Sequence, residues 1–472
     1  MSLEIAAARL LAPYLGSSLQ VWGSLISVIL GAMAVGYAIG GRVADRSPGD
    51  GPLFGAILAS GVYQAGVLFL AHPLLRRLAR WPEIEATLAA IVVLFALPTF
   101  LLACVTPCVI RLSAREGVGT TAGAVCALGA IGSIGGVLLT SFVLLPQAGT
   151  RATHQGLAAL SLMLGAIGLL PRRISIVGLA TMALPFAPER AWPAGTLWTA
   201  ESIYHVVQVV AVGSVRGLVL DQEQSLHTAL DLTGGRVHGY WDDFAVGPLL
   251  ARGHRVLVLG MGGGASVRAV RSADPEATID AVEIDEVVVR VAADQFGVEP
   301  GSDLRIHVGD ARRFLAASGD GYDVIQMDLF RGGPDIPSHL ATREFYELAR
   351  GRLNRAGVLM VNVFDIAPGH PLLASIATTL SYAFPAIFVR THRQMNHVVL
   401  AFGEPRSLSE VRAALDAAPL PVSEIAHEVS RDVRPFSPDR GAIVLTDDRA
   451  PVEGLTRRMM EAARTAGVLP SR

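Results

Sequence analysis

The sequence predicts an α-helical membrane domain followed by an α/β region, in which a small β-hairpin domain precedes a doubly wound, mostly parallel Rossmann-like sheet. Three features of the chain predict this architecture. Long uncharged apolar runs fill the chain up to about residue 190. From residue 255 onward, strand-like and helix-like segments alternate regularly, as parallel strands require. Acidic residues stand at the ends of three strand-like runs and a glycine-rich loop follows a fourth, at the edge where doubly wound sheets bind ligands.

The composition supports this division and excludes several classes of protein. Of the 472 residues, 51% are hydrophobic and only 17% are charged, which is too apolar for a wholly soluble protein of this size. The net charge of −2 creates no field for a polyanion, so nucleic acid is not an expected partner. Lysine is absent, which excludes a Schiff-base mechanism. Cys104, Cys108 and Cys126 all lie in the apolar part and lack the paired spacing of a disulfide framework or a metal site.

The first expected domain, residues 1–190, crosses a lipid bilayer several times. Glycines at Gly36/Gly40 and Gly132/Gly136 have the spacing that lets membrane helices approach closely. A sixth apolar run, Ile174–Ala187, is short enough to be a short span, a re-entrant piece or an interfacial helix. Five uncharged runs are long enough to span about 30 Å of hydrocarbon, namely Val21–Gly41, Pro52–Leu75, Ala86–Ile110, Gly117–Thr150 and Ala152–Pro171.

Behind the membrane domain we expect a small β domain with its following loop (197–245), a Rossmann-like domain (250–455) and a C-terminal tail (456–472). Residues 204–212 and 218–221 alternate between apolar and polar, and residues 213–217 between them predict a hairpin turn. The expected strands of the large sheet are 255–260, 278–283, 305–309, 323–328, 357–363, 386–391 and 397–402, and its expected helices include 266–273, 286–296 and 342–353.

The first strand of this sheet ends in a glycine-rich loop, Gly260-Met-Gly-Gly-Gly264. Gly260, Gly262 and Gly264 let the backbone turn tightly and approach a bound ligand. Glu283 follows about twenty residues later, at the end of the second strand, where a carboxylate accepts hydrogen bonds from a ribose diol. Asp285 either assists this binding or caps the next helix. The loop does not follow the GxGxxG spacing, which argues against a nicotinamide dehydrogenase.

Two further carboxylates follow the third and fourth strands. Asp310 suits an adenine amino group, because an ionised carboxylate accepts a hydrogen bond from an N–H donor. Its alternative role is an ordinary N-cap of the following helix. Asp328 stands at the fourth strand end, where a carboxylate can hold and deprotonate an attacking amine. The alternative for Asp328 is a purely structural carboxylate.

Together these segments resemble the spermidine synthase (polyamine aminopropyltransferase) family over about residues 200–400. The resemblance rests on Val258–Gly264, Val282–Asp285, Gly309–Ala311, Tyr322–Ile325 with Asp328, and Glu344–Tyr346. The earlier Glu201–Tyr204, Leu220-Asp221, Gln224 and Tyr240 are similar to the β domain and gate loop of that family. The apolar front, with Asp328–Pro337, His339-Leu340 and Leu445–Glu453, is similar to its membrane-fused branch.

The resemblance implies decarboxylated S-adenosylmethionine as a co-substrate, with no tightly bound cofactor and no metal. Its ribose is expected on Glu283 and its adenine on Asp310, and Gln224, Asp285 and the loop glycines complete the donor-binding set. Asp328 is then expected to activate a small-molecule amine that Tyr240 helps to hold, with release of methylthioadenosine. Because soluble members are often dimers, the resemblance also implies a homodimer.

Four positions depart from the soluble members of the family. Gly263 and Arg331 stand where those enzymes have aspartates, and His205 and Trp241 replace other polar residues of the site. With these changes, the donor could also be S-adenosylmethionine that still carries its carboxylate. The alternative function is then a methyltransferase, or another alkyl transferase that acts on a membrane-associated acceptor. A polyamine transporter or sensor is the second alternative.

The distribution of arginines gives a weak preference for the orientation of the membrane domain. The positive-inside rule puts the group that includes Arg42, Arg46 and Arg111 in the cytoplasm. A nucleoside-sulfonium donor is made in the cytosol, so we expect the sixth run not to span. The expected location is therefore the cell (inner) membrane, multi-pass, with a cytoplasmic catalytic domain.

Overall fold

The computed structural model of the chain describes residues 1–15, 19–47, 49–78, 81, 83–114, 117–169, 195–221, 226–319, 321–331, 333–393 and 395–466. The contacts between residues divide the chain into two compact units, Met1–Pro193 with Arg472, and Ala194–Ser471.

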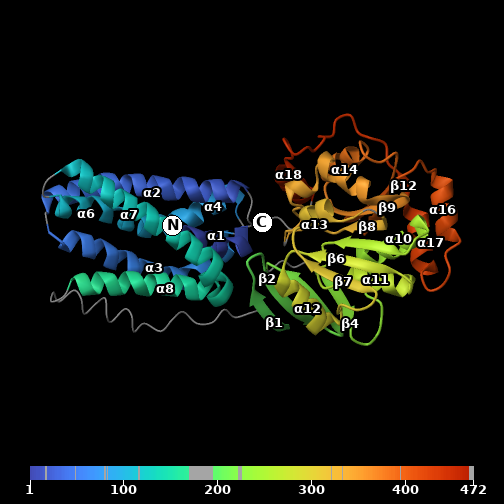
Figure 1. Cartoon of the computed structure of the whole chain (residues 1–472), viewed down its shortest axis with the longest axis horizontal. Helices are drawn as coiled ribbons and strands as arrows, with labels where there is room; N and C mark the ends of the chain where they lie inside the picture. The colour runs from blue at the N-terminus through green and yellow to red at the C-terminus, as the bar shows by residue number, and fades with distance from the viewer. Residues whose placement is uncertain are drawn as a thin grey trace. The chain divides into compact units, whose positions relative to one another are not determined.

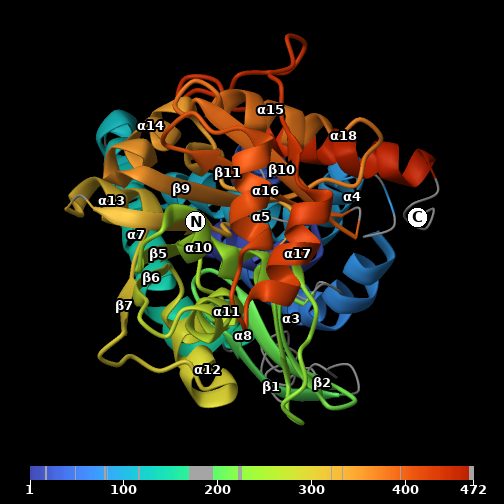
Figure 2. The ribbon, with the colours of Figure 1, turned by 90° about the vertical axis from the view of Figure 1, so that its right-hand side faces the viewer.

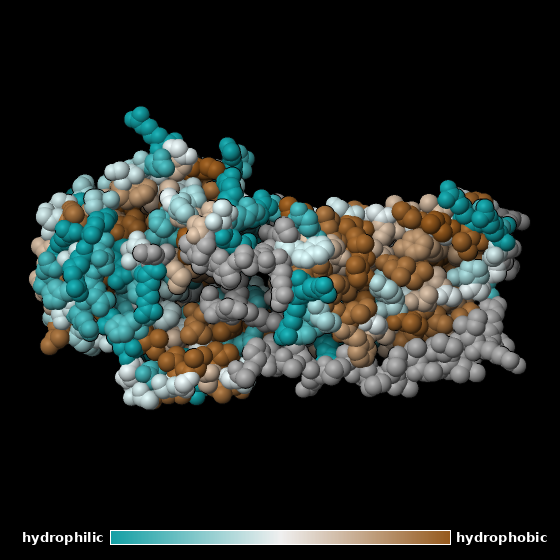
Figure 3. Space-filling view, turned by 180° about the vertical axis from the view of Figure 1, so that it is seen from behind, coloured by the Kyte–Doolittle hydropathy of each residue, from teal (hydrophilic) through white to brown (hydrophobic). Residues whose placement is uncertain are grey.

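The first unit consists of helices that follow the uncharged runs of the sequence (Figure 1). On the face shown in Figure 3, apolar side chains cover much of the first unit, whereas hydrophilic side chains predominate on the second unit. The described helices are α1 (Ser2–Leu15), α2 (Leu19–Arg46), α3 (Gly51–Leu78), α4 (Glu83–Ile91), η1 (Val92–Ala96), α5 (Leu97–Ala103), α6 (Val105–Ser113), α7 (Val118–Leu139), η2 (Thr140–Leu144) and α8 (Leu145–Gly168).

Four helical stretches among the described residues are long and apolar enough to cross a membrane, and they coincide with the first four expected spans. The fifth expected span, Ala152–Pro171, falls on α8, which is not among the four; Thr153, His154 and Gln155 make its start polar. The sixth run, Ile174–Ala187, lies outside the described residues. The four stretches are Gln20–Arg46, Gly51–Leu78, Ile84–Ser113 and Val118–Leu144.

The expected close helix contact exists at one of the two glycine pairs. A Cβ added to Gly40 would lie 2.6 Å from Cys104 Cα, and one added to Gly36 would lie 2.5 Å from a backbone oxygen of α5. Bare glycine backbone therefore lets α2 touch the α5–α6 segment. At the second pair the prediction is only half right: Gly136 approaches a serine of α1, but nothing lies within 4 Å of a Cβ added to Gly132.

The second unit begins with an antiparallel sheet of four strands, in the order β1-β2-β3-β4. The expected hairpin corresponds to β2 and β3, but the predicted turn of residues 213–217 is too long. Gly213, with a φ of 62°, and Ser214 close the turn by themselves, so that Val212 pairs with Val215. The strands are β1 (Thr196–Glu201), β2 (Val206–Val212), β3 (Val215–Leu220) and β4 (Thr228–Asp231).

A larger sheet of eight strands follows, in the order β12-β10-β11-β9-β8-β5-β6-β7. Strands β7, β6, β5, β8 and β9 are parallel to one another, and β11, β10 and β12 are antiparallel additions. The doubly wound, Rossmann-like fold is therefore confirmed, although β9 begins four residues earlier than expected. The strands are β5 (Arg255–Leu259), β6 (Thr278–Glu283), β7 (Leu304–Val308), β8 (Tyr322–Met327), β9 (Leu353–Phe364), β10 (Ala386–His392), β11 (Asn396–Phe402) and β12 (Arg434–Pro435).

Helices cover both faces of the large sheet (Figures 1 and 2). Alternate strand residues point to opposite faces, so Val256 and Val258 join one apolar core while Leu257 and Leu259 join the other. The first core contains η3 (Tyr240–Val246), α10 (Gly247–Ala251), α11 (Ala265–Ala273), α16 (Leu408–Asp416) and α17 (Ser423–Asp432). The second contains α13 (Ala311–Ala317), α14 (Arg343–Arg352), α15 (Pro371–Leu380) and α18 (Val452–Thr465).

Two helices make packing contacts that the sequence did not predict. Helix α12 (Glu286–Phe296) packs Val288 and Val291 against the small sheet. Helix α18 runs across the boundary expected at residue 456, and its Met459 packs against Ile366 and Ala367. The described part of the expected tail, residues 456–466, therefore continues the folded unit.

A buried ion pair holds η3 against β10. Arg390 Nε lies 3.2 Å from Asp243 Oδ2, and the two side chains are only 6% and 4% exposed. Glu428 lies farther away, 4.0 Å from the same guanidinium. Because η3 begins at Tyr240, this pair fixes an element that carries an expected site residue.

Replacement of Arg390 by methionine should lower the free energy of unfolding by about 3 kcal/mol, because it leaves the Asp243 carboxylate buried without its partner. Urea unfolding of the full chain in detergent at pH 8 measures this loss; burial raises the pKa of Asp243 to about 7, so the carboxylate is ionised at that pH. The matched control is Arg355→Met, which breaks the exposed pair with Glu404 and should cost less than about 1 kcal/mol. Equal losses in the two variants would contradict the prediction.

Candidate active site

The expected ligand-binding residues follow the carboxyl ends of four neighbouring parallel strands, β8-β5-β6-β7. Leu259 of β5 pairs with Met327 of β8 and Val282 of β6, so the residues after these positions meet at one edge of the sheet. At Gly260 the contact is close, since an added Cβ would lie 2.2 Å from the backbone oxygen of Asp328. The glycine loop and the end of β8 are therefore in direct contact.

Glu283 ties the glycine loop to the end of β6. Its Oε2 accepts a hydrogen bond from Gly262 N at 2.9 Å, and its Oε1 accepts one from Asp285 N at 3.1 Å. Gly260, Gly262 and Gly264 have φ values of 82°, 53° and 80°, in the left-handed region that favours glycine. Burial raises the pKa of Glu283, and the two backbone N–H groups oppose this rise. Each carboxylate oxygen keeps a second lone pair for a ligand hydroxyl.

Asp285 acts as a helix cap in this structure. Its Oδ1 accepts a hydrogen bond from Val287 N at 2.9 Å, and its Oδ2 accepts one from the hydroxyl of Ser202. The side chain is almost fully buried. Of the two alternatives left open by the sequence, the geometry favours the cap, and the contact with Ser202 joins the small sheet to the ligand-binding edge.

Asp310 also caps a helix, but it remains partly exposed. Its Oδ1 accepts a hydrogen bond from Arg313 N at 2.8 Å, and its Oδ2 lies 3.4 Å from His339 Nε2. Burial, followed by the charges of Asp285 and Asp310, raises the pKa of Tyr204. The Tyr204 phenol of the small sheet therefore lies near this edge as well.

Asp328 is a half-buried carboxylate between two donors. Tyr240 Oη donates to its Oδ2 at 3.0 Å, and Asn362 Nδ2 donates to its Oδ1 at 2.8 Å. Burial raises the pKa of Asp328 to about 6; the hydrogen bonds from Asn362 and Tyr240 lower it, and the charge of Glu283 raises it. A carboxylate with such a pKa is poised to take a proton near neutral pH. The expected pair of Asp328 and Tyr240 is thus in direct contact.

Several polar residues at this edge were not among the expected site residues. Asn362 interrupts the apolar strand β9, and this interruption is the feature that could have identified it. His205 is buried, and its Nδ1 lies 2.9 Å from Asp221 Oδ2. Burial lowers the pKa of His205, but the hydrogen bond to Asp221 and the charges of Asp285 and Glu283 outweigh burial, so the pKa is raised.

The departure at Gly263 has a packing cause. Gly263 N donates to Thr228 Oγ1 at 3.0 Å, and a Cβ added to Gly263 would lie 2.8 Å from Thr228 Cγ2. The neighbouring strand β4 thus occupies the space that a side chain would need. Arg331, the second departure, lies 3.8 Å from Glu453 of α18.

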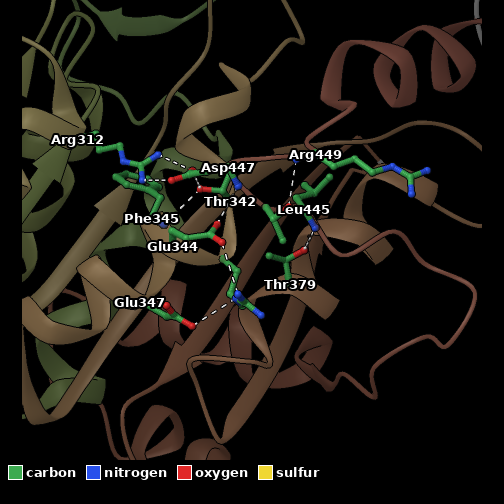
Figure 4. A network of polar contacts seen from close by, with 11 residues as sticks. Arg312, Thr342, Glu344, Phe345, Glu347, Thr379, Leu445, Asp447 and Arg449 are labelled. Carbon is green, nitrogen blue, oxygen red and sulfur yellow. Dashed lines mark hydrogen bonds and ion pairs between the residues drawn. The ribbon is translucent and has the colours of Figure 1, made fainter.

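The acidic pair Asp447-Asp448 lies in the Leu445–Glu453 segment, which contributed to the sequence resemblance. In the structure, Asp447 has a structural role. Its carboxylate accepts two hydrogen bonds from Arg312, at 2.7 and 2.6 Å, and one from Thr342 Oγ1 at 2.7 Å (Figure 4). Its backbone N–H donates to Glu344. These contacts tie the C-terminal segment to α13 and α14, so the Asp447 carboxylate is already satisfied by protein groups.

Gln224, expected to bind the donor, lies outside the described residues. Within the ranges that the structure describes, His, Cys, Asp and Glu side chains form no group of three or more that could hold a metal ion.

Comparison with known proteins identifies the domain that carries this site. Residues 244–393 match the family described as the spermine/spermidine synthase domain. A probable polyamine aminopropyl transferase of Bifidobacterium longum is 28% identical over 304 residues, which cover 60% of this chain and 67% of that protein. The polyamine aminopropyltransferase of Vibrio vulnificus is 41% identical over 114 residues, which cover 24% and 38% of the two chains.

A relative with another activity also matches part of this chain. The human eEF1A lysine and N-terminal methyltransferase is 30% identical over 146 residues, or 29% of this chain and 21% of that protein. Two of these three matches thus span well under half of the relative's own length. The family match and the polyamine aminopropyltransferase relatives agree with the motifs at the sheet edge and support a transferase domain of the spermine/spermidine synthase type in residues 244–393.

Proposed function

We propose that the chain is a membrane-bound aminopropyltransferase, which transfers the aminopropyl group of decarboxylated S-adenosylmethionine to an amine and releases methylthioadenosine. The observation that carries this proposal is the half-buried Asp328 carboxylate, which Tyr240 contacts at 3.0 Å beside the glycine loop. Asp328 would accept the proton of the acceptor ammonium, and Tyr240 would orient the acceptor.

The donor would lie along the edge formed by the ends of β5, β6 and β7. The free lone pairs of Glu283 suit the two ribose hydroxyls, and the partly exposed Asp310 suits the adenine amino group. The backbone at Gly260, Gly262 and Gly264 leaves room for close approach of the nucleoside. Gln224 and Asp285 remain proposed members of this set, Asp285 through its cap rather than through direct contact.

The reaction that we propose is a displacement at carbon. The deprotonated amine nitrogen forms a bond to the methylene carbon beside the sulfonium, and the carbon–sulfur bond breaks with its electron pair moving to sulfur. Positioning of the two substrates supplies most of the acceleration, because the sulfonium is already a good leaving group. The residues of this chain bind, orient and accept one proton.

A methyltransferase that uses intact S-adenosylmethionine is the second candidate. It is favoured by the human methyltransferase relative and by Gly263, where Thr228 excludes the carboxylate that would pair with an aminopropyl ammonium. Incubation with either donor distinguishes the two: the first reaction yields methylthioadenosine, the second S-adenosylhomocysteine. Transport or sensing without chemistry would leave both donors intact.

We further infer a multi-pass location in the cell membrane, with the four long apolar helices in the bilayer and the second unit in the cytoplasm, where the donor is made. A homodimer, proposed from the family resemblance, completes this assignment.

Replacement of Asp328 by asparagine should lower kcat for aminopropyl transfer by about 100-fold or more, because general-base catalysis is lost. Donor affinity, measured by calorimetry, should remain, since Glu283 and the glycine loop are untouched. The control is Asp416→Asn, which neutralises an exposed aspartate at the end of α16. Unchanged turnover in Asp328→Asn would exclude Asp328 as the base.

The pH dependence of kcat/KM should show an acid limb near pH 6, because the pKa of Asp328 is about 6 and only its ionised form accepts a proton. Activity should therefore rise with pH through 6 and fall about tenfold per unit below it. Tyr240→Phe should move this limb to higher pH, since the Tyr240 hydrogen bond lowers the pKa of Asp328. A limb that stays in place would show that another group titrates.

A further inference from the structure

Three strands bring three polar side chains to the same point of the sheet. Met327 of β8 pairs with Val361 of β9, so Asp328 lies beside Asn362. Strand β11 runs antiparallel to β9 and pairs Asn396 with Phe364. Asn396 and Asn362 are thus diagonal neighbours on one face, because residues two apart along a strand share a face.

Hydrogen bonds connect these side chains in series. Asn396 Nδ2 donates to Asn362 Oδ1 at 3.1 Å, and Asn362 Nδ2 donates to Asp328 Oδ1 at 2.8 Å. The Asn362 side chain is 1% exposed, so rotation of its amide would bury an unpaired group and set two oxygens against each other. The donor from Asn396 therefore fixes which end of the Asn362 amide faces Asp328.

We propose that Asn362 and Asn396 are positioning residues, which hold the Asp328 carboxylate as an oriented anion ready to accept a proton. Their role in catalysis rests on the proposed aminopropyl transfer. Asn362 acts on the carboxylate directly, and Asn396 acts only through Asn362.

The other groups that face Asp328 explain why such a donor is needed. Burial favours the neutral acid, and the charge of Glu283 from β6 favours it further. Tyr240 of η3 and Asn362 of β9 supply the two opposing hydrogen bonds. Since Tyr240 also faces the expected acceptor, Asn362 is the donor that lies on the protein side of the carboxylate.

Asn362→Leu should move the acid limb of kcat/KM upward by about one pH unit or more, since a hydrogen bond to a charged group is lost at nearly constant volume. Asn396→Ala should move the limb in the same direction by less, because the Asn362 amide remains but can rotate. Donor affinity should stay unchanged in both variants. The matched control is Asn354→Ala, which removes a similar bond to Asp323 at the far end of β9 and should leave the limb in place.

The double variant Asn362→Leu with Asn396→Ala tests the series arrangement. Its acid limb should coincide with that of Asn362→Leu alone, because among the described residues Asn396 reaches Asp328 through Asn362. An additional shift would contradict this route. An unshifted limb in both single variants of an active enzyme would overturn the proposal and leave the aminopropyl transfer intact. If Asn362→Leu fails to fold, the half-buried Asn396 still provides the test.

A second measurement needs no turnover and separates this proposal from the proposed reaction. The pKa of Asp328, about 6, lies above the ordinary 3.8, so its proton stabilises the fold below pH 4 and that stability is lost as pH rises through 6. In thermal unfolding, the stability of Asn362→Leu should continue to fall up to a higher pH than that of the unsubstituted protein. In a background that carries Asp328→Asn, the Asn362→Leu substitution should no longer change the pH dependence of stability. A curve that Asn362→Leu leaves unchanged would overturn the proposal, whether or not the enzyme transfers an aminopropyl group.

Discussion

Two backbone hydrogen bonds to one buried carboxylate hold the ligand-binding edge of the sheet together. Glu283 accepts from Gly262 in the loop after β5 and from Asp285 in the turn after β6. A buried anion is strongly unfavourable unless donors compensate it, so the carboxylate fixes both segments at once. Through Gly260 the same loop presses against the backbone of Asp328. This one side chain thereby determines the spacing between the expected nucleoside and the expected base.

The small sheet is part of this edge and not only a connection between the helical unit and the large sheet. Ser202 donates to Asp285, His205 is held by Asp221 near the Glu283 carboxylate, and Thr228 accepts from Gly263. Ser202 and His205 belong to the turn between β1 and β2, Asp221 follows β3, and Thr228 begins β4. Because the glycine loop is held from both sides, a change in the small sheet would alter the geometry of the donor site without touching the large sheet.

Most of the fold could be predicted from the sequence, because hydrophobic period and strand–helix alternation are local properties of the chain. The positions of Glu283 and Asp328 followed from the rule that strand ends share an edge. The roles of Asp285 and Asp310 did not, since an N-cap and a ligand-binding carboxylate occupy the same place in such a pattern. The role of Asn396 could not be predicted for another reason. Its contact with Asn362 depends on the register between two strands, which no local sequence pattern encodes.

The charge of the site follows from packing as much as from residue choice. Gly263 cannot gain a side chain while Thr228 stands against it, so a carboxylate there would require a change in β4 as well. At the other departure, Arg331 lies near Glu453 of α18, so its charge is partly balanced by a helix close to the end of the chain. Under the proposed transfer reaction, donor preference and acceptor preference would therefore depend on different elements, β4 beside the glycine loop and α18 beside the segment after Asp328. The acceptor class could then change without rebuilding the nucleoside site.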